Sequence, residues 1–215
     1  MRKTKLSLAM LTGALCVTMA QLAYADPNFD VSPWTYVGKA GDCGTGYAAG
    51  SKIIVAKWID QIGLQDESGD ADKGLLLSKN GPTSDCSAAG ASIKNVGPVK
   101  RGGVTVPGIT LTQLGYDVRN GGHCASGAPR FDVNATDGWH FMGACNNATV
   151  TALQAGWNRV RIDPYSASNA FPPLGAGATI ISIDIVFDEG VDAGPDNSGL
   201  AIIDNIDING TLVGK

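Results

Sequence analysis

The two histidines of the chain, His123 and His140, are the first residues to consider for catalysis. A catalytic base works when a third group orients it beside a nucleophile or a metal. Neither histidine stands in an H-E-x-x-H zinc motif, and the chain has no G-x-S-x-G nucleophile motif. His140, next to Trp139, fits a strand residue at the surface of a sheet. We therefore expect no enzyme, with glycoside hydrolysis by paired carboxylates as the weaker alternative.

A tryptophan with two arginines indicates ligand binding instead. In "GWNRVRID", strand alternation turns Val160 and Ile162 toward the core and leaves Trp157, Arg159 and Arg161 on the outer face. An exposed indole stacks on a sugar ring, and a guanidinium donates hydrogen bonds to its hydroxyl groups. These three residues are therefore predicted to bind a ligand.

Trp139 is a second candidate for such an aromatic platform. It lies in "RFDVNATDGWHFMG", just after the Asp137-Gly138 pair that marks the turn of a β-hairpin. The alternative for both tryptophans is burial, because a tryptophan also packs under loops at the ends of strands. Exposure of the two indoles decides between these interpretations.

One carboxylate, that of Asp204, stands in an apolar row. Strict alternation through "GLAIIDNIDING" (199–210) places Asp204 on one face with four aliphatic residues: Leu200, Ile202, Ile206 and Ile208. A buried carboxylate without a partner is costly, so Asp204 needs one. Backbone amides or a nearby arginine such as Arg130 are one answer, and a shared calcium ion is another.

The first 25 residues have the features of a secretory signal peptide. Three basic residues lie within the first five positions, an apolar stretch covers 6–22, and Ala23-Tyr24-Ala25 forms a cleavage site. An uncleaved anchor is the alternative, but the apolar stretch is short for a membrane-spanning helix. We expect a protein secreted to the extracellular space or periplasm, with one domain over 26–215 and no membrane insertion after cleavage.

The charge of the chain limits its partners. The net charge is −4, and removal of the basic leader makes the remainder more acidic still. Nucleic acid and anionic lipid surfaces favour basic proteins, so both are poor partners here. An extracellular glycan or a surface protein is the expected partner.

Four cysteines follow the leader: Cys43, Cys86, Cys124 and Cys145. An even number of cysteines in an exported chain predicts disulfides, and four cysteines allow three pairings. Cys124–Cys145 is favoured because these residues flank the expected hairpin, which leaves Cys43–Cys86. Free or metal-bound thiols are the alternative, but no C-x-x-C spacing supports a metal site.

Strand-like runs separated by turn residues cover most of the chain. The clearest lie at 52–59, 74–79, 91–96, 108–119, 130–134, 138–143, 158–163, 179–187 and 200–209. Several alternate between apolar and polar residues, as in 179–187, where Ile181, Ile183, Ile185 and Phe187 share one face. Alternation of this kind is typical of antiparallel sheets with one buried face. The spacing predicts an all-β protein, a two-sheet antiparallel β-sandwich in preference to a barrel.

The two ends of the chain resemble a known family. The stretch "NFDVSPW" (28–34) combines a Phe-acid pair with a tryptophan, and the chain closes on "IIDNIDING" (202–210). Together they resemble secreted jelly-roll carbohydrate-binding modules of the galactose-binding-like type. The middle, "GGHCASGAPRFDV" (121–133), is not part of that pattern. It is similar to bacterial secreted proteins of unassigned role.

The resemblance implies a jelly-roll sandwich whose first and last strands lie side by side. It also implies a structural calcium ion held by an acid of the first motif and one of the last strand, here Asp30 and Asp204. The usual glycine after the first acid is missing, since Val31-Ser32-Pro33 stand there. We expect a non-catalytic module for extracellular glycans, with a surface, matrix or adhesion protein as the alternative.

Overall fold

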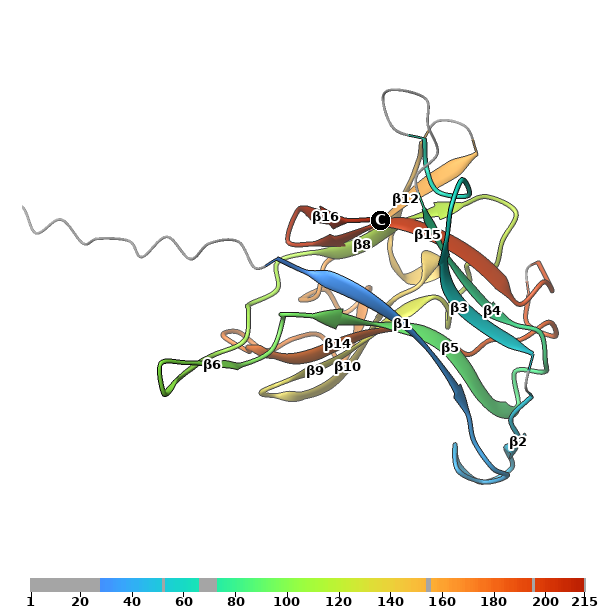
Figure 1. Ribbon diagram of the computed structural model, residues 1–215, viewed down its shortest axis with the longest axis horizontal. Coiled ribbons are helices and arrows are strands. Elements are labelled where there is room, and N and C mark those ends of the chain that lie inside the picture. The colour runs from blue at the N-terminus through green and yellow to red at the C-terminus, as the bar shows by residue number, and fades with distance from the viewer. Residues whose placement is uncertain (1–27, 52, 66–72, 154–155, 195, 215) are drawn as a thin grey trace, which may run out of the picture.

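The computed structural model describes residues 28–51, 53–65, 73–153, 156–194 and 196–214. It forms two antiparallel sheets that pack face to face as two layers (Figure 1). This confirms the predicted all-β sandwich. The expected signal peptide at 1–25 lies outside the described residues. Within them, the single helical element is the short 3₁₀ turn η1 (Cys145–Asn147), and no helix is long and apolar enough to cross a membrane.

Sheet I forms one layer of the sandwich. Its strands are, in spatial order, β1 (Asp30–Val37), β5 (Asp85–Lys94), β14 (Ile180–Phe187), β9 (Arg130–Ala135), β10 (Gly138–Gly143) and β13 (Ala170–Phe171), with β2 (Ala48–Ala49) beside β5. The strands β9 and β10 form the hairpin that Asp137-Gly138 predicted. The β2–β5 contact is parallel, whereas the neighbours along the main path run antiparallel.

Sheet II forms the other layer. Its strands are, in spatial order, β11 (Thr149–Ala152), β12 (Trp157–Ile162), β8 (Leu114–Arg119), β15 (Leu200–Ile208), β4 (Gly74–Lys79) and β3 (Ile54–Ile59), with β16 (Thr211–Val213) beside β15. A separate hairpin of β6 (Val99–Arg101) and β7 (Val104–Val106) links β5 to β8 and projects beyond the sandwich (Figure 1).

The core lies between the two sheets because every long strand turns alternate residues inward. Sheet I contributes, among others, Val31, Ile93, Phe131 and Ile185, and sheet II contributes Leu77, Tyr116, Val160 and Ile203. These belong to one continuous hydrophobic cluster. The side chains between them in sequence therefore form two outer faces, one on each sheet.

Two β-bulges correct the alternation expected from the sequence. On β15, Asp204 pairs with Asp117 and Asp207 with Gly115, so the bulged strand carries one extra residue, and Asn205 has a φ of 45°. Consequently Ala201 and Ile203 face the core before the bulge, whereas Ile206 and Ile208 face it afterwards. The prediction that Asp204 shares a face with Ile206 and Ile208 is wrong.

The second bulge lies at the start of β14. Ile180 pairs with Ala135 and Ser182 with Asn134, although Ala135 and Asn134 are adjacent in β9. Ile180 is fully buried and Ile181 is 43% exposed, so Ile181 does not share the core face with Ile183, Ile185 and Phe187. As in β15, an inserted residue reverses the phase of the strand.

The first and last long strands do not lie side by side as the resemblance implied. β1 pairs with β5 in sheet I, whereas β15 lies between β8 and β4 in sheet II. At the sandwich edge β1 meets β3 instead, and the Trp58 indole Nε1 donates to the Val31 carbonyl at 3.2 Å. This contact covers part of an otherwise open strand edge.

Candidate ligand-binding face

At the β10–β13 end of sheet I, three large aromatic side chains are exposed on the outer face. Trp139 and Phe141 alternate with the buried His140 and Met142 on β10, so both point outward. Phe171 on β13 lies directly opposite Phe141. The exposed fractions of Trp139, Phe141 and Phe171 are 56%, 47% and 48%. We call these three residues the aromatic face.

Polar side chains flank the aromatic face on the neighbouring strand β9. Phe131 and Val133 point into the core, so Arg130, Asp132 and Asn134 point outward. Asn134 lies opposite Trp139 and Asp132 opposite Phe141. Cross-strand neighbours on one face lie within side-chain contact distance, so the polar row and the aromatic face form one continuous surface.

Arg130 binds two carboxylates beside the aromatic face. Its two terminal nitrogens reach the Asp188 oxygens at 2.7 and 2.9 Å, and its Nε reaches Asp132 Oδ1 at 2.8 Å. The guanidinium carbon lies 5.7 Å from the ring centre of Phe141. Burial acts to lower the pKa of Arg130, but the hydrogen bonds and charges of Asp188 and Asp132 raise it.

Asp132 lies close to two other carboxylates, those of Asp184 and Asp188. Its direct cross-strand partner on β14 is Asp184, so two carboxylates face each other on this surface. Burial raises the pKa of Asp132, and the nearby charges of Asp188 and Asp184 add to the rise while Arg130 opposes it. The carboxyl group is therefore less acidic than that of a solvated aspartate.

Asp184 is held by two hydrogen bonds from the strands on its other side. The Trp34 indole Nε1 donates to Asp184 Oδ1 at 3.2 Å, and Ser92 Oγ donates to the same oxygen at 2.6 Å. The Trp34 ring packs on Gly90, where a Cβ atom would come within 2.3 Å of its Cζ2. Only a glycine permits this approach. The polar row thus continues to the edge strand β1.

The outer face of sheet II differs from the prediction made for it. Trp157 is only 5% exposed, so the prediction of an exposed indole there is wrong. It is the first residue of β12, directly after the β11–β12 connection, and its carbonyl accepts the Leu153 amide at 2.8 Å. This is the alternative noted for tryptophans at strand ends.

Arg159 and Arg161 point outward as expected, but both are bound to buried carboxylates. Arg159 donates to both oxygens of Asp117 at 3.0 Å, and Arg161 Nε lies 2.7 Å from Asp207 Oδ2. Asp117 and Asp207 are 0% and 2% exposed. Because Trp157 lies in sheet II and Trp139 in sheet I, the predicted binding residues form no single site.

Asp204 accepts backbone amides, which was one of the two partners considered for it. Leu64 N donates to Asp204 Oδ2 at 2.8 Å and Asn205 N to Oδ1 at 2.7 Å, while Ser32 Oγ donates to Asp30 Oδ2 at 3.2 Å. Asp30 and Asp204 lie on strands of different sheets, and the described residues contain no metal-binding cluster of three or more His, Cys, Asp or Glu side chains. Calcium binding by Asp30 and Asp204 stays a prediction.

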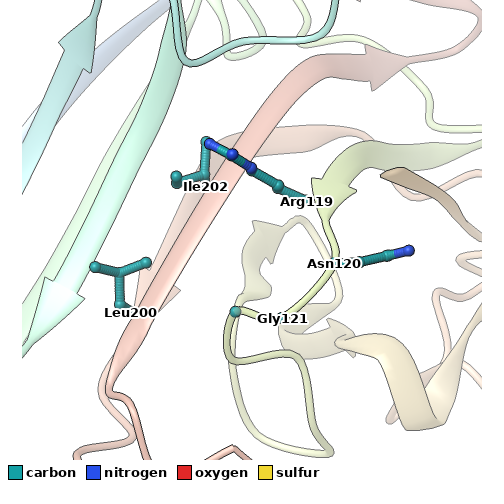
Figure 2. A pocket seen from close by; sticks show the side chains of 6 residues that line it. Arg119, Asn120, Gly121, Leu200 and Ile202 are labelled. Carbon is teal, nitrogen blue, oxygen red and sulfur yellow. The ribbon is translucent and has the colours of Figure 1, made fainter. Parts of the chain in front are cut away.

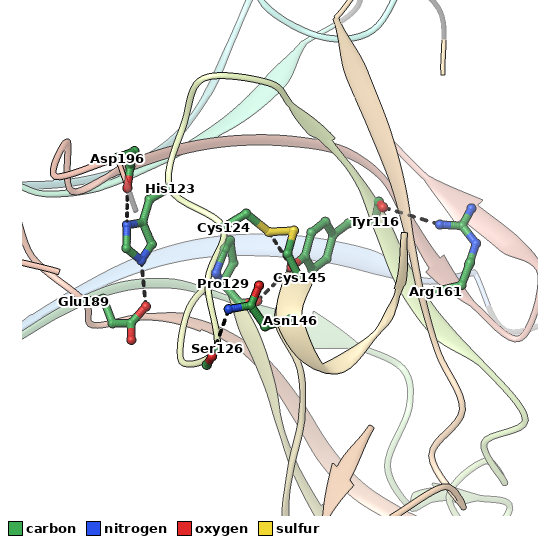
Figure 3. The surroundings of a disulfide bond; sticks show 10 residues. All are labelled: Tyr116, His123, Cys124, Ser126, Pro129, Cys145, Asn146, Arg161, Glu189 and Asp196. Atoms are coloured by element: carbon green, nitrogen blue, oxygen red, sulfur yellow. Dashed lines mark hydrogen bonds and ion pairs between the residues drawn. A yellow bond between two sulfur atoms is a disulfide. The ribbon is translucent and has the colours of Figure 1, made fainter. Parts of the chain in front are cut away.

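Both disulfides form with the expected connectivity, Cys43–Cys86 and Cys124–Cys145. Figure 3 shows the second one beside the buried Tyr116, whose hydroxyl donates to the Pro129 carbonyl at 2.8 Å. Burial raises the pKa of this hydroxyl, so it stays protonated. The bridge ties the 121–129 loop, which leads into β9, to η1 after β10.

The histidines have structural partners on both ring nitrogens. Buried His123 lies between Asp196 and Glu189, each at 2.6 Å (Figure 3). His140 faces the interior, so its predicted surface position is wrong; its Nδ1 lies 2.9 Å from the Pro172 carbonyl and its Nε2 3.0 Å from Asp137. Neither ring is positioned as a free base toward a described nucleophile.

Among these features, the aromatic face was only partly predictable. Trp139 was identified from its own neighbourhood, whereas Phe141, Phe171 and the Asp132–Asp184 pair were missed. Alternation through "GWHFMG" would have placed Phe141 beside Trp139, but nothing local in the sequence pairs Phe171 with it. No protein-family model, curated protein or solved structure matches the chain, so the comparisons assign it no family.

Proposed function

We propose that the protein is a secreted, non-catalytic module that binds extracellular glycans through the outer face of sheet I. The observation that carries the proposal is the aromatic face, on which Trp139, Phe141 and Phe171 are each about half exposed on two paired strands. Single exposed aromatics are ordinary on a protein surface, but a contiguous group of three favours a binding site.

The chemistry of this face suits a sugar. Aromatic rings offer flat apolar surfaces to the C–H faces of a pyranose, and the flanking Asn134, Asp132 and Arg130 offer donors and acceptors to its hydroxyl groups. Arg130 and Asp132 are already held by ion pairs. They would lose little conformational freedom on binding, which favours affinity.

Secretion is supported by two separate features. The leader-like segment at 1–25 has the charge, apolar stretch and cleavage site of a signal peptide. The two disulfides are typical of proteins in oxidising compartments. Expression of the full-length chain followed by mass spectrometry of the exported product tests this, because a signal peptide predicts an N-terminus at Asp26.

The binding experiment is retention on a panel of insoluble polysaccharides and mobility in gels that contain soluble ones. We expect retention on at least one polymer, with affinity at least tenfold weaker in Trp139→Ala. Tyr47→Ala is the matched control because Tyr47 is an exposed aromatic outside sheet I's aromatic face. Equal loss in both variants, or no retention on any polymer, would favour the surface or adhesion protein instead.

A second candidate function rests on the Asp132–Asp184 pair. Directly opposed carboxylates, one with a raised pKa, are the elements of glycoside hydrolysis. This candidate predicts release of reducing ends from a retained polymer, lost in Asp132→Asn. Retention of the polymer without release of reducing ends, both before and after the Asp132→Asn substitution, would favour the non-catalytic binding module.

The calcium prediction has its own test. A calcium ion bound only by the native protein stabilises it by mass action, about 2.7 kcal/mol at a hundredfold excess over Kd. The prediction is that a chelator lowers the melting temperature, and that Asp30→Ala and Asp204→Ala each remove this response. A melting temperature that the chelator leaves unchanged would contradict the calcium prediction.

A further inference from the structure

A small pocket lies on the outer face of sheet II, on the opposite side of the sandwich from the aromatic face. Its volume is about 160 Å³, and it is lined by Arg119, Asn120, Gly121, Gly122, Leu200 and Ile202 (Figure 2). Ile203 pairs with Val118 in the antiparallel strands β15 and β8, so Ile202, one residue before Ile203, lies opposite Arg119, one residue after Val118. Figure 2 shows the Arg119 side chain extended toward Ile202, whereas the Asn120 side chain points away.

No described residue neutralises the charge of Arg119. Arg130, Arg159 and Arg161 each form an ion pair with at least one aspartate. In the described part of the chain the Arg119 side chain has no ion pair and no hydrogen bond, and no carboxylate lines the pocket. A guanidinium with open donors binds a carboxylate through two parallel hydrogen bonds.

The rest of the pocket combines an apolar side with main-chain donors. Leu200 and Ile202 point outward from β15 ahead of its bulge and are half-buried. The 121–122 turn packs closely on β15, because a Cβ atom at Gly122 would lie 2.9 Å from the Leu200 carbonyl oxygen. The amides of Gly121 and Gly122 donate to no acceptor among the described residues.

We propose that this pocket binds a compact aliphatic carboxylate, with the carboxylate on Arg119 and the alkyl group against Leu200 and Ile202. A cavity of about 150 Å³ accommodates benzene, so the ligand has roughly six to eight non-hydrogen atoms. A free branched-chain acid and the C-terminal residue of a peptide both present this chemistry. The site does not depend on glycan binding, since it lies on the other sheet.

The first test is an NMR titration of the ¹⁵N-labelled protein with 4-methylpentanoate. We expect saturable shifts of the Gly121 and Gly122 amides with a Kd of about 1 mM, a reasonable affinity for so small a ligand. The uncharged 4-methylpentanamide has the same shape and is expected to bind at least fivefold more weakly. Absence of shifts with the acid, or equal binding of the amide, would overturn the proposal.

The second test uses Arg119→Gln with Arg101→Gln as its control, since Arg101 is also exposed and lies on the distant β6–β7 hairpin. We expect at least tenfold weaker binding only in Arg119→Gln, with an unchanged melting temperature; equal binding in that variant would contradict the proposal.

A tetrapeptide ending in leucine distinguishes the two possible sources of the ligand, a free acid and a peptide C-terminus. If the tetrapeptide binds more tightly than 4-methylpentanoate, the ligand is a peptide C-terminus. If the tetrapeptide binds more weakly, the ligand is the free acid. If amidation of its C-terminus leaves the binding unaltered, the pocket is not a carboxylate site.

Discussion

The outer faces of the two sheets carry similar residue types, but the tryptophan is exposed on one and buried on the other. On sheet I, Trp139 is open to solvent beside Phe141. On sheet II, Trp157 is buried, and the neighbouring Arg159 and Arg161 are bound to aspartates. A tryptophan near charged residues is thus exposed to solvent in one sheet and buried beside ion-paired arginines in the other. Arginines are ion-paired on both faces, so the burial of the tryptophan is what separates the two outcomes.

The largest difference is expected when each tryptophan is replaced. Trp157→Ala removes a buried indole and should lower the free energy of unfolding by about 3–5 kcal/mol, whereas Trp139→Ala should change it by less than about 0.5 kcal/mol. Urea unfolding of the two variants measures both values. Similar losses in the two variants would show that the faces do not differ in packing.

The next largest effect concerns the carboxylates. Asp117→Ala removes the acceptor of two Arg159 hydrogen bonds and one from Asn205, and should cost about 2 kcal/mol after allowance for the partial exposure of Arg159. Asp132→Ala should cost less than about 0.5 kcal/mol, because it also relieves repulsion from Asp184 and Asp188. Equal losses of unfolding free energy in the two variants would contradict the view that the carboxylates on sheet I repel one another.

The smallest effect is a pH dependence on sheet I. Burial and the Asp188 and Asp184 charges raise the pKa of Asp132 in the folded state, so the native protein holds this proton more tightly than the unfolded chain. Its stabilising contribution is present below the ordinary aspartate pKa of about 3.9 and is lost as the pH rises through the folded value.

Asp132→Asn should therefore gain stability relative to the unchanged protein as the pH rises from about 3 to about 7, by roughly 1 kcal/mol or less. Thermal unfolding of both proteins across this range measures the gain. Asp163→Asn is the control, since Asp163 is exposed and lies in the loop after β12. A relative loss of stability in Asp132→Asn with rising pH would reverse the sign assigned to Asp132.

The strands and disulfides were largely predictable, and the surfaces were not. Alternation located β4 and β10 to the residue and identified the turn at Asp137-Gly138, because these signals are local. The phase of β15 failed at Asn205, since one residue in the left-handed region shifts every later side chain to the other face. Asparagine adopts that conformation more readily than most residues, so the "DNID" stretch carried a weak sign of the bulge.

The burial of Trp157 could not be read from its own neighbours, because the exposure of a residue at a strand end depends on tertiary packing that local alternation does not describe. The separation of Asp30 and Asp204 into different sheets likewise depends on topology. Short motifs at the two ends of a chain do not specify which strands become neighbours. Phe171 is a further example, since its place beside Phe141 requires a pairing between segments 30 residues apart.

The position of β15 within sheet II has a consequence for how the molecule is made. This strand comes after β3, β4, β8, β11 and β12 in the chain, yet it lies between β8 and β4 and joins the two halves of the sheet. Folding dominated by such distant pairings is slow, on the order of milliseconds to seconds. The chain must therefore be synthesised as far as β15 before sheet II can close, and until then β11–β12–β8 and β4–β3 have no strand that joins them.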